Sequence, residues 1–138
     1  MHTRVARNPI MTLHVGVNAR TFDVDQPGGA VQSVRRLVRE LTERDDVSVT
    51  LYGAASLESQ FDAGVVSRLF PSRLPAQLVW ERTYLPWRAK VDDVDVLFCP
   101  NGNGPFHHPD VPVALLVHDV NAQLGLSSHI HRLYRKAM

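Results

Sequence analysis

The sequence contains very little cysteine: Cys99 is the only one among its 138 residues. No disulfide can therefore form within the chain, and a reducing compartment fits this composition. Cys99 ends an apolar run, where a buried structural thiol is commoner than a nucleophile. The sequence also lacks any apolar segment approaching the roughly 20 residues that cross a bilayer. The first residues lack the apolar core of a signal peptide. We therefore expect a cytoplasmic protein with a disordered leader over residues 1–11.

An excess of charge of either sign is also missing. Fifteen lysines and arginines face fourteen acidic residues, which gives a formal net charge of +1. Such a balance does not produce the strong field that binds polyanions, so nucleic acid is not an expected partner. Thirteen of the fifteen cations are arginines, which suit bidentate contact with phosphate or carboxylate. Codon usage in a GC-rich genome explains that preference as well.

The remaining composition is that of a globular domain. Apolar residues make up 44% of the chain and charged residues 21%, which is too apolar for a disordered protein. The length allows one domain with one real core.

Metal-binding motifs are absent too. Five of the seven histidines lie between His107 and His131, which raises the question of a metal site. Their spacing forms no H-E-x-x-H motif, and a single cysteine excludes a zinc finger. Chance and a surface pair at His107 and His108 explain the cluster better. We expect no metal and no cofactor.

Alternating strand and helix patterns predict an α/β fold. The expected strands cover residues 12–18, 47–52, 64–70, 94–99 and 111–117. Because strands alternate with helices, the sheet should be parallel and doubly wound (Rossmann-like), with strand order 3-2-1-4-5. The fifth strand is almost pure valine, leucine and alanine, which predicts burial on both of its faces.

Two helices are expected between these strands. The first starts at the glycine pair Gly28-Gly29 and runs to about residue 44, with one apolar stripe facing the sheet. Its other face carries Arg35, Arg36, Arg39, Glu40 and Glu43, which we interpret as a solvated face with local ion pairs. The second helix covers about residues 76–90 and contains a proline, Pro86, that should kink or split it. Its expected inward residues are Leu78, Val79, and Tyr84 or Leu85.

Three unusual segments should meet at one edge of this sheet. The strand order reverses between strands one and four, so residues 19–29 and 100–105 flank the switch point where such sheets bind ligands. The long loop 19–27 carries Arg20, and long loops in compact domains are often functional. Residues His118 and Asp119 directly follow the fifth strand and lie one strand further along the same edge.

The glycine pair before the first helix has two readings. The pattern supports two interpretations about equally. The pair is either a flexible turn or a place where the backbone closely approaches a diphosphate or a sugar hydroxyl. The sequence forms neither a G-x-G-x-x-G nor a Walker A motif, which disfavours a dinucleotide site and a P-loop NTPase.

The polar residues of this edge also allow more than one role. His118 is either a satisfied buried histidine or a catalytic group whose tautomer Asp119 fixes, and Asp119 alternatively caps the next segment. Asn101 and Asn103 have donors and acceptors for sugar hydroxyls, although Asn-Gly is also ordinary turn chemistry.

Taken in order, these motifs resemble the N-terminal domain of family 4 glycosyltransferases, which have the GT-B fold. The resemblance covers most of residues 13–134. It is carried by the first strand with Gly28, Gly29 and Ala30, and by Trp80-Glu81 with Leu85-Pro86. Residues 95–105 and Val117-His118-Asp119 complete it.

The resemblance implies a retaining transfer of a sugar from a nucleotide-sugar donor to an acceptor, without a metal. It implies His118 and Asp119 as the catalytic residues, against the donor sugar. Glu81 and Pro86 are implied to be structural members of the second helix. The implied substrate-binding residues are Gly28, Gly29 and Ala30 beside the diphosphate, with Arg20, Asn101 and Asn103.

The resemblance also has a large gap. Family members hold most of the nucleotide in a second Rossmann-like domain, whose Glu-rich motif and basic pair this sequence lacks. We therefore expect residues 12–138 to be a partial N-terminal domain that is inactive by itself. It is a gene fragment, a truncated product or part of a split enzyme, and in the last case its partner is a C-terminal donor-binding domain encoded separately. The alternative is a stand-alone, non-catalytic α/β binding or interaction module. Peripheral contact with a membrane surface stays open.

Overall fold

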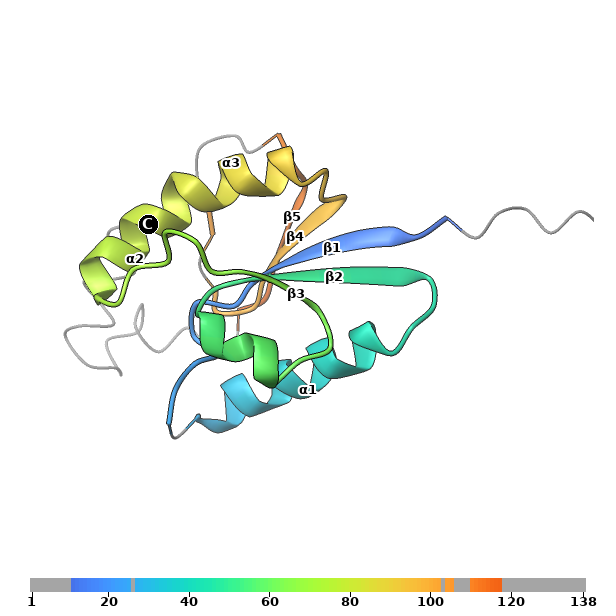
Figure 1. Cartoon of the computed structure of the whole chain (residues 1–138), viewed down its shortest axis with the longest axis horizontal. Helices are drawn as coiled ribbons and strands as arrows, with labels where there is room; N and C mark the ends of the chain where they lie inside the picture. Colours follow the sequence, from blue (N-terminus) through green and yellow to red (C-terminus); the bar gives the residue numbers. More distant parts are fainter. Residues whose placement is uncertain (1–10, 26, 103, 106–109, 118–138) are drawn as a thin grey trace, which may run out of the picture.

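The computed structural model describes residues 11–25, 27–102, 104–105 and 110–117. In this part of the chain a five-stranded parallel sheet lies between α1 on one face and α2 with α3 on the other (Figure 1). The predicted α/β class with a Rossmann-like parallel sheet is confirmed. In chain order the elements are β1 (Leu13–Asn18), α1 (Gly29–Thr42), β2 (Val47–Tyr52), the short 3-10 helix η1 (Ala55–Ser59), β3 (Gly64–Val66), α2 (Leu74–Arg82), α3 (Tyr84–Val91), β4 (Val96–Cys99) and β5 (Val113–Leu115).

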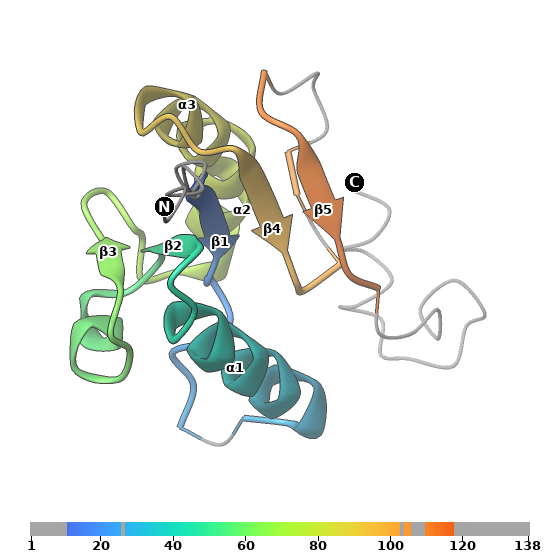
Figure 2. The ribbon, with the colours of Figure 1, turned by 90° about the vertical axis from the view of Figure 1, so that its right-hand side faces the viewer.

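The strand order is β3-β2-β1-β4-β5, as the sequence predicts. All pairs are parallel, and the central strand β1 places Val17 opposite Leu51 of β2 and Phe98 of β4. In Figure 2, β4 and β5 lie on one side of the central strand β1, whereas β2 and β3 lie on its other side. Because the winding reverses between β1 and β4, the segments that leave these two strands start side by side at the carboxyl edge.

Two hydrophobic clusters hold the layers together, one on each face of the sheet. On the α1 face, Val34 and Val38 of the helix pack with Val17 and Leu51 of the strands. Val34 and Val38 lie four residues apart, on the side of α1 that faces the sheet. The other cluster joins the sheet to α2 and α3, and its buried members are Tyr52, Trp80, Leu85, Ala89, Val94, Leu97, Cys99 and Val111.

A glycine in β1 makes room for Tyr52, one of the large side chains of the second cluster. A Cβ atom at Gly16 would lie 2.9 Å from the Tyr52 ring and 3.0 Å from Val94. Any larger residue at position 16 would therefore force Tyr52 or Val94 to move. The Tyr52 hydroxyl donates a 2.9 Å hydrogen bond to Asp92, at the end of α3. Burial and this carboxylate raise the pKa of Tyr52, so the hydroxyl stays a donor.

Four strands are shorter than predicted. β1 starts at Leu13 and not at residue 12, β4 starts at Val96 and not at residue 94, and β5 covers Val113–Leu115 and not 111–117. The third strand ends at Val66 and not at residue 70, because a turn follows in which Phe70 N bonds to Ser67 O and Leu69 has a φ of 64°. The prediction that the fifth strand is buried on both faces is wrong. In the described part of the chain β5 is the edge of the sheet, and Leu115 is 46% exposed.

The predicted second helix is two helices, α2 and α3, that meet at Thr83. Pro86 explains the position of the break, because its ring clashes with the carbonyl group four residues earlier, at Arg82. The prediction that Val79 faces inward is wrong, since its side chain is 62% exposed. Trp80 and Glu81 are buried instead.

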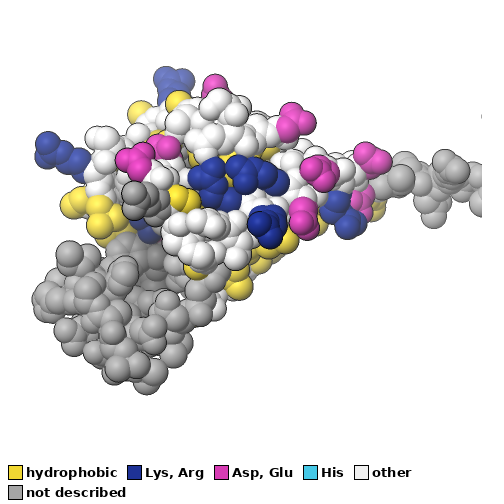
Figure 3. Space-filling view, turned by 90° about the horizontal axis from the view of Figure 1, so that it is seen from below, with side chains coloured by type: hydrophobic (Ala, Val, Ile, Leu, Met, Phe, Trp, Pro, Cys, Tyr) yellow, Lys and Arg dark blue, Asp and Glu magenta, His cyan; other side chains and the backbone are white. Residues whose placement is uncertain are grey.

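The outer face of α1 is only partly the solvated face that the sequence predicts. Lys and Arg side chains gather over this helix in the view from below (Figure 3). The prediction is wrong for Arg35, which is half-buried and donates hydrogen bonds to the Phe22 carbonyl and to Gln60. Arg39 lies over the Phe61 ring, 4.8 Å from its centroid.

Two further expectations concern the predicted leader and membrane-spanning segments. The predicted leader falls outside the described residues except for Met11, which is 90% exposed. Within the described ranges, no helix has the length and apolar character that crossing a membrane requires.

The core assignment makes a direct prediction about stability. Leu51→Ala should lower the free energy of unfolding by about 2–5 kcal/mol, because Leu51 is 0% exposed and its removal leaves a cavity. The matched control is Leu37→Ala on α1, where a 43% exposed leucine should cost less than about 1 kcal/mol. Chemical denaturation of the three proteins measures both values. Equal losses in the two variants would contradict the assignment.

Candidate functional site

The candidate site lies at the carboxyl edge of the sheet, where β1 and β4 end. Asn18 is the last residue of β1 and is fully buried, and Asn101 follows β4 by two residues. Because the two strands pair in parallel, these two side chains come to the same edge. Arg20, in the segment after β1, lies beside them.

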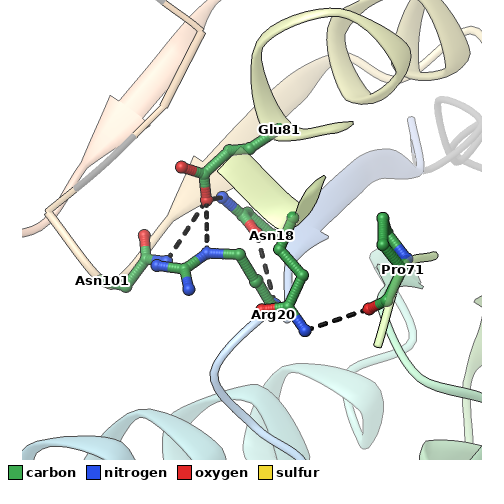
Figure 4. A network of polar contacts seen from close by, with 6 residues as sticks. Asn18, Arg20, Pro71, Glu81 and Asn101 are labelled. Carbon is green, nitrogen blue, oxygen red and sulfur yellow. Dashed lines mark hydrogen bonds and ion pairs between the residues drawn. The ribbon is translucent and has the colours of Figure 1, made fainter. Parts of the chain in front are cut away.

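A carboxylate from α2 connects these residues (Figure 4). One oxygen of Glu81, Oε2, accepts hydrogen bonds from Asn18 Nδ2 at 2.7 Å and from Arg20 Nε at 3.0 Å. Asn101 Nδ2 is a more distant donor to the same atom, at 3.5 Å. The side-chain oxygen of Asn18 accepts the backbone N–H of Arg20 at 3.3 Å. Glu81 thus joins the ends of two strands to a helix on the face of the sheet.

The ion pair in this network is almost completely buried. The side chains of Arg20 and Glu81 are 8% and 4% exposed. Burial of a single charge is costly, so each of these groups depends on its opposite charge and on the neighbouring amides. Charge-assisted hydrogen bonds of this kind are short and directional. The network therefore fixes the segments that follow β1 and β4 relative to α2.

Cys99, the last residue of β4, lies next to this network and is chemically inert. Burial raises the pKa of its thiol to about 12, and the negative charge of Glu81 adds to the effect. At neutral pH the thiol is therefore protonated and is a poor nucleophile. The prediction that Cys99 is buried is confirmed.

The start of α1 is open in contrast to this closed network. Gly28, Gly29 and Ala30 are exposed, and a Cβ atom added at either glycine would meet no atom within 4 Å. Gly28 has an ordinary extended conformation with φ −66° and ψ 167°, and its position at the N-cap supplies no side-chain acceptor for the first N–H groups. The packing and conformation of the described residues therefore do not require glycine at these positions.

The structure brings together only some of the residues predicted for the site. Asn101 and Arg20 both turn toward Glu81, so the guanidinium of Arg20 is engaged inside the protein. Gly28 and Gly29 face open space. Asn103, His118 and Asp119 lie outside the described residues, and their roles stay predictions.

Glu81 is the central residue that sequence reasoning undervalued. The resemblance implied a structural member of a helix, which agrees with its burial but not with its place among the residues of the strand ends. A signal was present in the sequence. A carboxylate beside a tryptophan, Trp80, on a helix that packs against a sheet needs a partner when it is buried. Arg20 and Asn18 are those partners.

Neither metal ligation nor similarity to other proteins adds to this picture. Over the described ranges, no group of three or more histidine, cysteine or acidic side chains is arranged to hold a metal ion. Comparison with known families, characterised proteins and solved structures gives no match for this chain.

The buried ion pair predicts a large response to the loss of one charge. Glu81→Gln should lower the free energy of unfolding by about 3–5 kcal/mol, because it removes one charge of a buried ion pair. In the matched control, Asp46→Asn removes a carboxylate from the exposed Arg44 pair, at 2.8 Å, and should cost far less, because an exposed ion pair contributes little to stability.

Chemical denaturation measures these values, and a double variant tests their cause. Arg20→Gln combined with Glu81→Gln removes both charges, so it should be more stable than Glu81→Gln alone. If Glu81→Gln costs no more than Asp46→Asn, the ion pair does not hold the strand ends in place.

Proposed function

We propose that this chain is the N-terminal domain of a retaining glycosyltransferase of the family 4 type, with GT-B architecture. Its reaction would move a sugar from a nucleotide-sugar donor to an acceptor. The observation that carries the proposal is the combination of the buried Glu81 network at the switch point with the open glycine start of α1. Ligands of doubly wound sheets bind at this place in the fold.

The chemistry of glycosyl transfer agrees with what these elements offer. A transfer that relies on positioning and on stabilisation of a leaving phosphate needs fixed loops and oriented N–H groups more than it needs a nucleophile. The network of Glu81 supplies the fixed loops, and the first turn of α1 supplies N–H groups at the positive end of a helix. Glycine at positions 28 and 29 would let a diphosphate or a sugar approach the backbone.

In this proposal the chain forms one wall of the active site. The nucleotide would be held mainly by a C-terminal donor-binding domain, which the proposal places outside these 138 residues. His118 and Asp119 would be the catalytic residues against the donor sugar, and Asn101 and Asn103 would face the acceptor. Arg20 would act through Glu81, because its guanidinium is engaged there. No metal or cofactor is part of the reaction.

The division of the site between two domains predicts that the chain alone is inactive. Incubated with UDP- and GDP-sugars and a panel of sugar and lipid acceptors, the purified chain should release no nucleotide above the rate without protein. Chromatography of the free nucleotide measures this release, and a complete glycosyltransferase is the positive control. Sugar transfer by the purified chain would contradict the need for a second domain.

The open glycine pair predicts that Gly29→Ala weakens the binding of a nucleotide sugar without lowering the stability of the chain. Gly29→Ala should leave the free energy of unfolding unchanged or raise it by up to about 1 kcal/mol, because alanine favours the helix and its Cβ meets no atom. The same Cβ should weaken the contact of the chain with a nucleotide sugar.

Saturation-transfer NMR with UDP- and GDP-sugars measures the contact, and thermal unfolding measures stability. Gly64→Ala makes the same change at another open glycine, at the start of β3, and as the matched control should leave the contact unchanged. If Gly29→Ala binds the nucleotide sugars as the unmodified chain does, the diphosphate does not lie at this turn.

A second candidate function is supported by the exposed edge of the sheet. Leu115 and Val117, in and after β5, are 46% and 47% exposed. An unpaired apolar edge is a common surface for protein association, as expected of a non-catalytic interaction module. The NMR experiment also separates the two candidates, since such a module has no reason to contact nucleotide sugars near Gly29.

A further inference from the structure

A groove of about 530 Å³ lies on the side of α1 that faces away from the sheet, between the helix, the loop before it and Gln60. Three arginines of α1 line it together, and they produce the gathering of basic side chains in Figure 3. The other described lining residues are Val24, Asp25, Pro27, Gln32 and Gln60.

The charges that face this groove are mostly positive. Arg39 is a surface neighbour of both Arg35 and Arg36, because it lies four residues after the first and three residues after the second on α1. Within the described residues none of the three forms an ion pair with a carboxylate. Asp25 lines the groove, and Asp23 lies close enough to act on Arg35. Three cations thus face two acidic groups.

Two of these arginines are held in place by the protein core. Arg35 donates hydrogen bonds to the Phe22 carbonyl and to the Gln60 side chain. Its guanidinium and that of Arg39 lie 5.5 and 4.8 Å from the centroid of the same Phe61 ring. Phe61 is buried, and its ring stacks on Phe22 at 5.8 Å. A mobile surface cluster would not have such a support.

The closeness of like charges is unfavourable unless an anion is present. Burial and the charge of Arg39 lower the pKa of Arg35, although the group stays protonated at neutral pH. A guanidinium group offers paired donors that match the oxygens of a phosphate, and Arg39 holds its guanidinium group over the Phe61 ring. The volume of the groove suits a small molecule. The net charge of +1 for the whole chain does not suit a nucleic acid.

We propose that this groove binds a phosphate-bearing group, either on a soluble phosphorylated compound or on a lipid headgroup. Arg36 and Arg39 would contact the phosphate directly, and Arg35, which is fixed by its hydrogen bonds, would add a third positive charge beside them. The proposal does not depend on the glycosyltransferase function, since it uses neither Glu81 nor the glycines that precede the helix.

Pyrophosphate is the probe for this site. Calorimetric titration into the full chain should give saturable 1:1 binding, and the side-chain Nε–H signals of Arg35 and Arg39 should shift in NMR spectra. The double variant R36Q/R39Q should weaken binding at least about tenfold, because it removes both direct charge-assisted contacts. The matched control R68Q removes an exposed arginine outside the groove and should change the affinity less than about twofold.

Thermal unfolding of R36Q/R39Q confirms that the variant is folded, and the single variants replace it if it is not. The proposal is overturned if binding does not saturate, or if R68Q weakens it as much as the double variant does. It is also overturned if Gly29→Ala abolishes binding while the arginine variants retain it, since the anion would then lie at the start of α1.

Vesicles separate the two sources of the phosphate. Sedimentation with phosphatidic acid vesicles, with phosphatidylcholine vesicles as the control, should retain the chain only if the groove takes a lipid headgroup. That retention should be lost in R36Q/R39Q and kept in R68Q. Saturable pyrophosphate binding without retention on vesicles assigns the groove to a soluble phosphorylated compound.

Discussion

The arrangement of the carboxyl edge depends on one buried carboxylate. Glu81 sits on α2, yet its Oε2 atom accepts hydrogen bonds from the last residue of β1 and from Arg20 beyond it. These contacts, with the longer one from Asn101, connect three separate segments at the reversal of the sheet. Hydrophobic packing alone is non-directional and would not fix the direction in which these segments leave the sheet.

The closed network and the open helix start have complementary physical properties. The network is dry and paired, so it gives stiffness and offers little to a ligand. The first turn of α1 has no covering atoms within 4 Å of the glycine positions, so it gives access but little stability. Glycine in a helix costs about 0.5–1 kcal/mol relative to alanine. The proposed glycosyl transfer would use both properties, a rigid network and an accessible backbone.

The sequence predicted the layers and the strand order because both follow from patterns along the chain. Strand-helix alternation and right-handed crossovers are enough to predict the order of the five strands. The split of the second helix also followed from one residue, Pro86, through its clash with the preceding turn. These features depend on local chemistry and on chirality, which a single sequence carries.

The errors arose where contacts between distant segments decide the outcome. Val79 and Trp80 are neighbours on one helix, and only the packing of α2 on the sheet decides that Trp80 is buried and Val79 exposed. Burial of β5 on both faces was inferred from its apolar residues, but it is the edge strand of the described sheet. Arg20 was expected to face a substrate, and its position shows how a buried Glu81 from another element captures it.

The two features of α1 that could attract phosphate differ in how they respond to their surroundings. The N–H groups of its first turn act through a partial charge that fades within one turn of the helix. The groove of Arg35, Arg36 and Arg39 acts through full charges, two of which the Phe61 ring holds in place. Full charges near the surface are screened by salt, and contacts to backbone N–H groups depend mainly on steric access. Binding at the groove should therefore weaken as ionic strength rises, and binding at the glycine turn should instead follow the size of the side chain at position 29. One helix can thus carry two anion sites, of which the groove responds to ionic strength and the glycine turn responds to the Gly29→Ala substitution.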